Sequence, residues 1–412
     1  MDQASSGAGE EDAPHRLFVV SAGNVALEHR HEYPNRNQVE GTEDPAQSWN
    51  ALTIGAYTER ASIGDPDFND WQPIATPGQL SPASRTSLVW SDKTLPVKPD
   101  IVMEGGNNAI DPATGRADFV DDLSLLTTRV SVTGAQLTTT GDTSAAAALA
   151  ARYAAIVWAN YPELWPETVR ALLVHSARWT DQMRAEFPDN QRHNRLRCYG
   201  YGVPNLSKAL WSASNAATLI VEGSLQPFYK DGSVKTKDMH LHNLPWPRQV
   251  LEDLGEVPVR MRVTLSNFIE PSPGRRGWTN KHRYQSHGLR FEVKRPLETN
   301  DEFHKRISKA AREDGEEVEH GSDVREWELG DHLRRKGSIH SDTWTGTAAE
   351  LAASGVIAVF PVTGWWKERH HLGRWDRQAR YALVVTIETD ETEVDLYTPI
   401  AVQIGGPVEA VI

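Results

Sequence analysis

The sequence predicts an α/β domain with a parallel sheet, followed by a β-rich domain. Before residue 215, short continuous apolar runs alternate with helical segments, which is typical of layered domains whose strands are buried on both faces. After residue 215, apolar and polar residues alternate, most clearly over 257–265, which indicates half-buried strands. We therefore expect a disordered or linker segment at 1–14, the α/β domain at 15–215 and a sandwich-like domain at 216–412.

Three buried strands are expected in the first domain. Residues 17–20 (Leu-Phe-Val-Val) and 51–56 (Ala-Leu-Thr-Ile-Gly-Ala) are continuous apolar runs, and a third run at 100–103 follows Lys98-Pro99. Because strands with apolar residues on both faces are typical of parallel sheets, the three runs are expected to share one sheet.

Two helices are expected after these strands. Residues 145–159 are rich in alanine and nearly free of helix breakers, which predicts a helix packed closely on its neighbours. Pro166 and Glu167 then begin a second helix that extends to about residue 177. Proline suits the first helical turn, and a carboxylate there lies at the positive end of the helix dipole.

The β-rich domain contains further strand candidates at 355–362 and 381–389. Before them, the charged stretch at 300–319 is expected to form an exposed helix. The first twelve residues are small, polar and acidic, and they are expected to be disordered.

Composition excludes several classes of protein. The net charge of −13 argues against nucleic acid as a main partner, since phosphate binding needs a basic face. No apolar run approaches the roughly 20 residues that span a bilayer, so no membrane interaction is expected. Cys198 is the one cysteine, so no intrachain disulfide can form. This cysteine usage and the absence of a signal-peptide pattern at the start favour the cytoplasm.

Two polar features point to chemistry. Ser144 stands at the start of the alanine-rich helix, where unpaired backbone N–H groups and the helix dipole favour a developing oxyanion. Asn24 follows the first buried strand, and its amide could donate a second hydrogen bond to such an oxyanion. Each feature also has an ordinary structural explanation: a serine or threonine helix cap for Ser144, and a Gly-Asn turn for Asn24.

Five segments in order resemble the subtilase family of serine peptidases (subtilisin-like, peptidase S8), here the C-terminal half of its catalytic domain. The resemblance implies a subtilisin-like three-layer domain over 15–215 that is incomplete at its N-terminus. The matching segments are 17–24, 98–102 (Lys-Pro-Asp-Ile-Val), 143–146 (Thr-Ser-Ala-Ala), 166–177 and 200–205 (Gly-Tyr-Gly-Val-Pro-Asn).

The resemblance assigns roles to individual residues. It implies that Ser144 is the nucleophile and that Asn24 and the Ser144 backbone N–H stabilise the oxyanion. It places Ser21, Gly23 and Thr143 in the substrate cleft. Because the family cleaves peptide bonds through an acyl-enzyme, the expected substrates are peptides or proteins, and neither a cofactor nor a metal is expected. The departures from the family pattern fit either a divergent bacterial branch or relaxed selection on an inactive site, and the resemblance allows an AAA-type ATPase as a partner.

The resemblance leaves the catalytic base unassigned. In subtilases, the triad histidine and aspartate precede the oxyanion asparagine, but here 23 residues precede Asn24. His15 is interpreted as a solvated loop residue, and His29, His31 and His175 follow Asn24. We therefore expect the Asp and His to come from an upstream segment or a partner, and the isolated chain to be nearly inactive. The alternative is a non-catalytic relative that binds peptides or protein partners.

The chain also departs from the family pattern near the nucleophile. Asp142 stands where the family usually has glycine, Ala148 replaces a proline, and Met103-Glu104 replaces Ala-Pro. Farther along, Trp365-Trp366, with Trp375 and two histidines nearby, fits either a ligand or metal site or an aromatic edge packed on the second domain. The acidic run at 313–319 fits a solvated surface better than a calcium site.

Overall fold

A computed structural model describes residues 1–9, 13–90, 95–211, 215–244, 246–274, 284–312, 327–390 and 408–411. Contacts divide the chain into two compact units that interleave along the sequence. Unit 1 comprises Met1, Leu17–Glu163 and Ser176–Ala209, and unit 2 comprises Asp2–Arg16, Leu164–His175 and Leu210–Ile412. The sequence-based limits of 15–215 and 216–412 stay a prediction.

Unit 1 is built on a parallel sheet, which confirms the predicted α/β character. Strand β2 (Leu52–Thr58) pairs in parallel with β1 (Val19–Ser21) and with β5 (Ile101–Glu104). The short β4 (Gln79–Leu80) runs antiparallel to the end of β2. All but one residue of β2 are buried, as expected for the middle strand of a parallel sheet.

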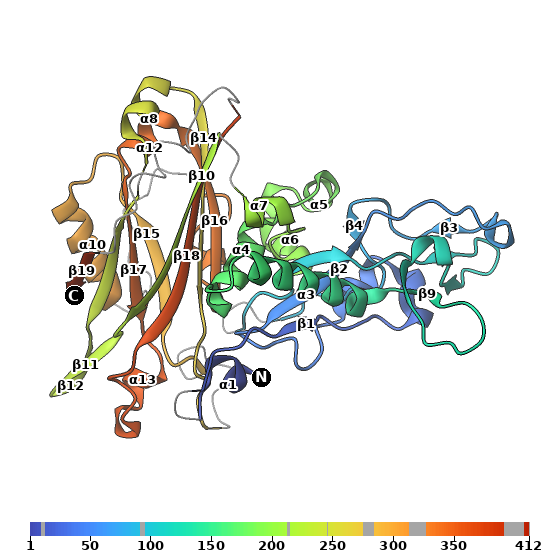
Figure 1. Cartoon of the computed structure of the whole chain (residues 1–412), viewed down its shortest axis with the longest axis horizontal. Helices are drawn as coiled ribbons and strands as arrows, with labels where there is room; N and C mark the ends of the chain where they lie inside the picture. The colour runs from blue at the N-terminus through green and yellow to red at the C-terminus, as the bar shows by residue number, and fades with distance from the viewer. Residues whose placement is uncertain are drawn as a thin grey trace. The chain divides into compact units, whose positions relative to one another are not determined.

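Helix α3 (Asp142–Asn160) contacts β1, β2 and β5 (Figure 1). Its buried residues are mostly alanine, so the helix backbone approaches the sheet closely. Helix α6 (Arg192–Tyr199) also contacts β2. The expected helix over 145–159 is therefore present and begins three residues earlier, so that Ser144 lies inside its first turn.

Short elements complete unit 1. Strands β8 and β9 form an antiparallel hairpin that leads directly into α3. The remaining elements connect the sheet to its helices. They are η1 (Leu27–Glu32), α2 (Asn35–Val39), η2 (Pro66–Phe68), β3 (Gln72–Pro73), β6 (Ala109–Ile110), β7 (Ala117–Asp118), η3 (Asp121–Leu123), β8 (Leu125–Thr128), β9 (Leu137–Thr140), α5 (Asp181–Glu186), η4 (Asp189–Gln191) and α7 (Leu206–Leu210), whose last residue belongs to unit 2.

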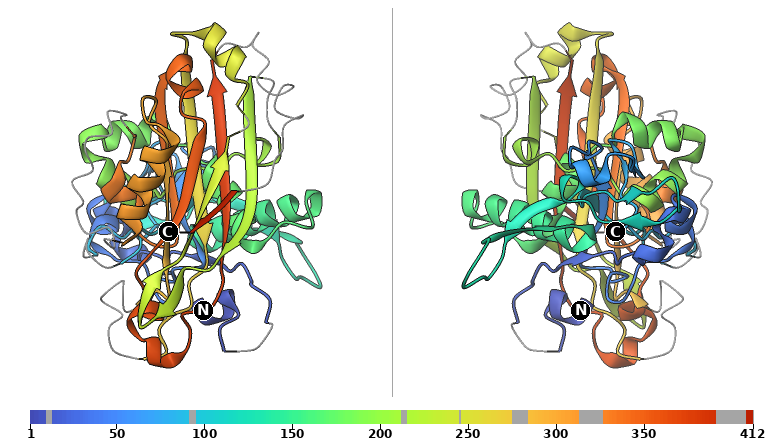
Figure 2. Two further views of the ribbon diagram at one scale, coloured as in Figure 1. Left: turned by 90° about the vertical axis from the view of Figure 1, so that its left-hand side faces the viewer. Right: turned by 90° about the vertical axis from the view of Figure 1, so that its right-hand side faces the viewer.

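Unit 2 contains two four-stranded antiparallel sheets, seen from two further sides in Figure 2. The first has the order β10 (Ala216–Leu225), β18 (Ala379–Thr389), β14 (Pro258–Asn267) and β16 (Ile339–Thr347). The second has the order β15 (Gly288–Val293), β17 (Val356–Val362), β13 (Asp238–Asn243) and β19 (Val408–Val411). A separate hairpin joins β11 (Phe228–Asp231) to β12 (Ser233–Thr236). The three strands expected from the sequence correspond to β14, β17 and β18.

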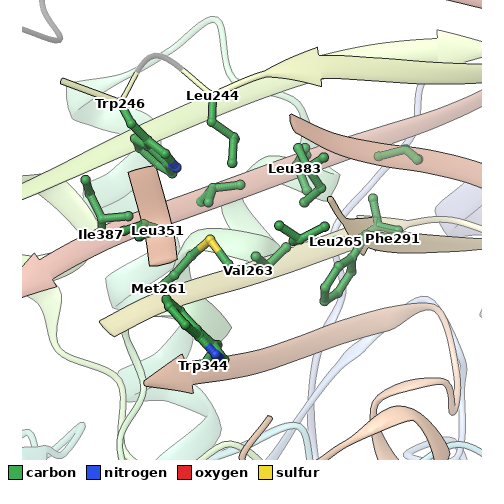
Figure 3. Packing of buried hydrophobic residues seen from close by; sticks show 14 of the residues in the cluster. Leu244, Trp246, Met261, Val263, Leu265, Phe291, Trp344, Leu351, Leu383 and Ile387 are labelled. Atoms are coloured by element: carbon green, nitrogen blue, oxygen red, sulfur yellow. The ribbon is translucent and has the colours of Figure 1, made fainter. Parts of the chain in front are cut away.

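One hydrophobic cluster includes residues from both sheets (Figure 3). Met261, Val263 and Leu265 occupy alternate positions of β14 and enter this cluster together, as the period-two pattern predicts. Phe291 of β15 and Leu383 of β18 belong to the same cluster. The alternating apolar residues therefore build the core that the two sheets share.

The helices of unit 2 differ in part from expectation. The opening segment, expected to be disordered, contains α1 (Asp2–Ser6). Helix α10 (Asn300–Arg312) buries Phe303 and Ile307 in a cluster with residues of β17, so one of its faces is not exposed. Residues 313–319 of the expected helix and acidic run lie outside the described residues. The other helices are α4 (Pro166–Ser176, Ser176 itself in unit 1), α8 (Arg248–Leu254), α11 (Asp331–Arg334), α12 (Ala348–Ala352), α13 (Trp365–Glu368) and η5 (His370–Leu372).

Helix α4 is anchored in unit 2 by a buried arginine. The Arg170 guanidinium donates to the Ser266 hydroxyl at 3.0 Å and to the carbonyl oxygens of Asn267 and Ser338 at 2.9 and 2.7 Å. Its charge lies 4.8 Å from the ring centre of Phe268. These contacts explain why residues 164–175 belong to unit 2 although they lie between two segments of unit 1.

The paired tryptophans are packing residues. Trp365 and Trp366 are buried with Phe228, and their indole N–H groups donate to the backbone oxygen and the carboxylate of Glu270 at 3.0 and 2.9 Å. This confirms the aromatic-packing interpretation for these two residues. Within the described ranges, no helix has the length and apolar character needed to cross a bilayer.

Candidate active site at the start of helix α3

The loop after β1 places Asn24 beside the start of α3. Ser21 ends β1 opposite Ile54, and the Ala22 N–H donates to the Ile54 carbonyl at 2.8 Å. Gly23 then turns the chain at φ +97°, where a Cβ atom would lie 2.8 Å from Cγ of Glu43. Both the positive φ and the close approach require glycine. The turn directs Asn24 toward the first residues of α3.

Two hydrogen bonds fix the Asn24 side chain. Its Oδ1 accepts from the Thr143 backbone N–H at 3.1 Å and from the Thr143 hydroxyl at 2.6 Å. A backbone N–H can only donate, so the amide atom facing it must be the oxygen. The Nδ2 group therefore points elsewhere, and it has no hydrogen-bond partner among the described residues. Asn24 is left with an oriented, available N–H donor.

Ser144 is the third residue of α3 and is exposed, whereas its neighbours Thr143 and Ala145 are buried. The Ala145 N–H is already bonded to the Gly141 carbonyl at 3.3 Å. No partner is present for the Ser144 N–H within the described residues, as expected in a first helical turn. The site thus combines an exposed hydroxyl with two available donors, the Ser144 N–H and the Asn24 amide.

Asp142 begins α3 in an uncommon backbone conformation. Its φ is +65°, and no other described residue except glycine has a positive φ. Its N–H donates to the Gly105 carbonyl at 2.6 Å. The sequence comparison with subtilases marked this position as an exchange of glycine for aspartate. The structure keeps the left-handed backbone that glycine adopts freely, and aspartate tolerates it better than most residues.

A buried arginine faces the Asp142 carboxylate, and sequence reasoning missed it. Both terminal nitrogens of Arg30 donate to Asp142, at 2.9 and 2.6 Å. The Arg30 side chain is 3% exposed. Arg30 lies in the short helix η1, where no periodicity or motif marks it. The unexplained charge at Asp142 was the one available signal that a cation should lie nearby.

The end of β5 is also held by a carboxylate. Glu104 accepts hydrogen bonds from the backbone N–H groups of Gly106 and Glu59, each at 2.7 Å. Burial, and then the charge of Glu104, raise the pKa of Glu59. Glu104 thus fixes the loop that leads to Gly105, the acceptor for Asp142.

The Lys-Pro-Asp-Ile segment has a structural role. Lys98 Nζ donates to Asp100 at 2.7 Å and to the Ala51 carbonyl at 2.9 Å, and both charged side chains are buried. The Asp100 carboxylate also accepts from the Thr53 N–H, at 2.7 Å. These bonds hold β5 beside β2, so they support the sheet that carries the candidate site.

No described histidine hydrogen-bonds to Ser144. In unit 1, His29 pairs with the exposed carboxylate of Glu32 at 3.2 Å, and His193 accepts from Arg197 at 2.9 Å. His175 belongs to unit 2, where its ring nitrogens contact the hydroxyls of Thr264 and Thr386.

His15 is not a solvated loop residue, so that interpretation is wrong. In unit 2 its Nδ1 lies 2.5 Å from a carboxylate oxygen of the buried Glu167, and its ring stacks on Phe268 at 5.8 Å. Burial raises the pKa of Glu167, but the hydrogen bond and charge of His15, together with the charge of Arg380, outweigh it and bring the pKa below its ordinary value. The sequence signal was hidden because the partners lie 152 residues apart.

Cys198 and the described histidine and carboxylate side chains are further candidates for reactive or metal-binding groups. Cys198 is fully buried, and burial raises the pKa of its thiol well above the ordinary value, so the reactive thiolate is disfavoured. Among the described residues, no three or more histidine, cysteine, aspartate and glutamate side chains gather as a metal would require.

Comparison with known proteins gives two matches. The model of the family described as the subtilase family matches residues 1–202. An uncharacterized protein named y4bN from Sinorhizobium fredii (strain NBRC 101917 / NGR234) is 26% identical over 363 residues. That alignment covers 86% of this chain and 77% of the other protein. The similarity to this relative therefore extends well beyond residue 202 into the β-rich part.

Proposed function

Since the chain belongs to the subtilase family through residues 1–202, we propose that it carries the nucleophile and oxyanion site of a serine endopeptidase. Ser144 attacks the carbonyl carbon of a peptide bond and forms the acyl-enzyme. The Asn24 amide and the Ser144 N–H donate to the oxygen of the tetrahedral intermediate. Peptides or proteins are the substrates.

The observation that carries this proposal is the orientation of the Asn24 amide. Thr143 holds Oδ1 through two hydrogen bonds, so Nδ2 remains free beside the start of α3. An oriented amide donor of this kind contributes about 3–4 kcal/mol to transition-state stabilisation. A helix cap alone needs no second donor on a separate loop, and this distinction favours catalysis over the structural explanation for Ser144.

The general base is proposed to come from outside the described residues. Ser144 needs a histidine to take its proton and a carboxylate to orient that histidine. The Ser144 hydroxyl has no hydrogen-bond partner among the described residues, and the histidines described above have other partners. We place the base and its carboxylate on an upstream segment or a partner chain, and we keep an AAA-type ATPase as a further proposed partner.

The edge of the sheet supports an added segment. Within the described residues β1 pairs with β2 alone, and its three residues are only half-buried. A strand at the edge of a sheet has unpaired backbone N–H and C=O groups that can accept a further strand. A further strand along β1 would complete a subtilisin-like three-layer domain. For unit 2 we propose a β-sandwich, because residues of both its sheets share one hydrophobic cluster.

A serine-directed fluorophosphonate tests the function. The purified chain is incubated with the probe alone and with a fragment encoded upstream of Met1, and labelling is located by mass spectrometry. Labelling of Ser144 that needs the fragment, and that falls about 10²-fold or more in Asn24→Ala, supports the proposal. Ser144→Ala is the control for labelling elsewhere. Absence of labelling in every combination would instead favour the non-catalytic, peptide-binding alternative.

A further inference from the structure

We propose that Arg30 is a positioning residue that sets the geometry of the oxyanion site by holding three segments together. The inference rests on the proposed roles of Ser144 and Asn24. Arg30 lies in unit 1, as do all of its partners. It does not contact the reacting atoms in this proposal, but acts through the residues on either side of them.

The three segments are fixed by four hydrogen bonds from one guanidinium group. Arg30 Nε donates to the Val25 carbonyl at 3.0 Å, which fixes the residue directly after Asn24. One terminal nitrogen donates to Asn108 Oδ1 at 2.8 Å and to Asp142 at 2.9 Å, and the other donates to Asp142 at 2.6 Å. The guanidinium thus joins the Asn24 loop, the segment after β5 and the first residue of α3.

The environment of Arg30 makes these bonds strong. Its side chain is 3% exposed and that of Asp142 is 20% exposed, so water competes little for the pair. Bidentate bonds between a guanidinium and a carboxylate are roughly twice as strong as neutral ones and fix the relative orientation of the two groups. The cation also lies 5.2 Å from the ring centre of Phe119. Asn108, the third partner, is itself buried.

The backbone of Asp142 explains why this clamp matters to catalysis. A non-glycine residue in the left-handed region costs roughly 1–2 kcal/mol, and the two bonds to Arg30 offset that cost. The next residue, Thr143, supplies both bonds that orient the Asn24 amide, and the one after it is Ser144. If Asp142 relaxed to a negative φ, the Thr143 N–H would turn away from Asn24. Both oxyanion donors would then lose their alignment.

The clamp predicts a specific pattern of substitution effects. Arg30→Met removes the donors while keeping the apolar stem, so Asp142 is free to relax. Asp142→Gly in the same chain removes the unpaired carboxylate and permits φ +65° without strain. The double variant should therefore recover the site geometry that Arg30→Met loses. Removing the partner also relieves an uncompensated buried charge, so thermal unfolding must separate the two roles. Loss and rescue of binding at an unchanged unfolding midpoint indicates positioning, whereas loss that follows the midpoint indicates general stability.

The first measurement is the affinity for phenylboronic acid of the full chain together with the upstream fragment that is proposed to supply the base. The Ser144 oxygen adds its lone pair to trigonal boron and its proton passes to solvent, which places a boron-bound oxygen at the oxyanion site. We expect Ser144-dependent binding that weakens about tenfold or more in Arg30→Met, toward the 10²-fold loss typical of a missing oxyanion donor. Binding should return to within about threefold of wild type in the double variant.

The second measurement is independent of chemistry at Ser144. Amide NMR signals of Asn24, Thr143 and Ser144 should shift in Arg30→Met and return in the double variant, and thermal unfolding shows that each variant is folded. Unchanged signals in a folded Arg30→Met chain would overturn the inference. Absence of Ser144-dependent boronate binding in wild type, with the predicted NMR pattern intact, would overturn the proposed function and leave the clamp standing. If the amide signals shift in Arg30→Met and do not return in the double variant, Arg30 is a residue that stabilises the fold without positioning the oxyanion donors.

Discussion

Acid should destabilise unit 2 because three of its histidines are buried in the neutral form. Burial lowers the pKa of His340 and of His287 to about 3 and that of His242 to about 4. Nearby cations, among them Arg290, lower the pKa of His340 further. In the same direction, His15 lowers the pKa of His287, and His240 lowers that of His242. In the unfolded chain each would bind a proton near pH 6.5.

The sign of the effect follows from where protons bind. Below pH 6.5 these histidines bind protons in the unfolded state but stay neutral in the folded state. Their contribution to the free energy of unfolding is therefore complete above pH 6.5 and is lost as the pH falls toward 4 and 3. Each histidine contributes a loss of about 1.4 kcal/mol per pH unit in that window. Asp342 opposes them, since burial raises its pKa to about 6 and its protonation favours the folded state between pH 6 and pH 4.

Three histidines against one aspartate leave a net loss of about 3 kcal/mol per pH unit between pH 6 and pH 4. The summed loss between pH 6.5 and pH 4 is about 8 kcal/mol, which is comparable to the usual stability of a domain, about 5–15 kcal/mol, so unit 2 should be strongly destabilised at pH 4. Urea unfolding at pH 7, 6 and 5, followed by tryptophan fluorescence, measures the slope. His340→Gln should reduce the slope by about 1.4 kcal/mol per pH unit, whereas the exposed His371→Gln should not. A flat or rising stability from pH 7 to pH 5 would refute the reasoning.

Two further predictions concern packing in unit 2. Gly223→Ala places a Cβ about 2.6 Å from the ring and hydroxyl of Tyr381, whose hydroxyl bonds His240 and His242, so it should cost roughly 2–4 kcal/mol of unfolding free energy. Gly355→Ala, with nothing within 4 Å, is the matched control, and equal midpoints in urea would contradict the clash. Leu265→Ala removes a fully buried side chain and should cost about 2–5 kcal/mol in the same assay, whereas Leu297→Ala, at a 98% exposed position, should change stability by less than about 0.5 kcal/mol.

The sequence predicted those parts of the fold that depend on local pattern. The continuous apolar runs at 51–56 and 100–103 became the buried strands β2 and β5, because a parallel sheet buries both faces of a strand. The run at 17–20 also became a parallel strand, β1, but its residues are only half-buried, so the expectation of burial on both faces was wrong there.

The alternation at 257–265 became β14, whose apolar face enters the core, but the expectation of a half-buried strand was wrong because the polar residues Arg262, Thr264 and Ser266 are buried as well. Ser144 could be placed at a helix start because the alanine-rich run after it has a high helix propensity and few breakers.

The parts that could not be predicted depend on contacts between distant residues. Arg30 and Asp142 are 112 residues apart, and η1 has no pattern that directs Arg30 inward. His15 was misinterpreted because its neighbour Pro14 suggests a loop, whereas the carboxylate that holds it is Glu167. A buried polar contact depends on the charge and geometry of residues that come together only when the chain folds. Such a contact produces no repeating pattern in the sequence from which it could be predicted.

The interleaving of the two units has a consequence for synthesis on the ribosome. The last segment of unit 1 ends at Ala209, and most of unit 2 is synthesised after it. Helix α4 has by then been made, but the partners of Arg170 in β14 and beside β16 have not. Helix α4 must therefore remain unpacked on the nascent chain until the segments that contact Arg170 have been synthesised. Because segments of the two units alternate along the sequence, neither unit can be exchanged as one continuous stretch. The two units are therefore expected to be inherited together.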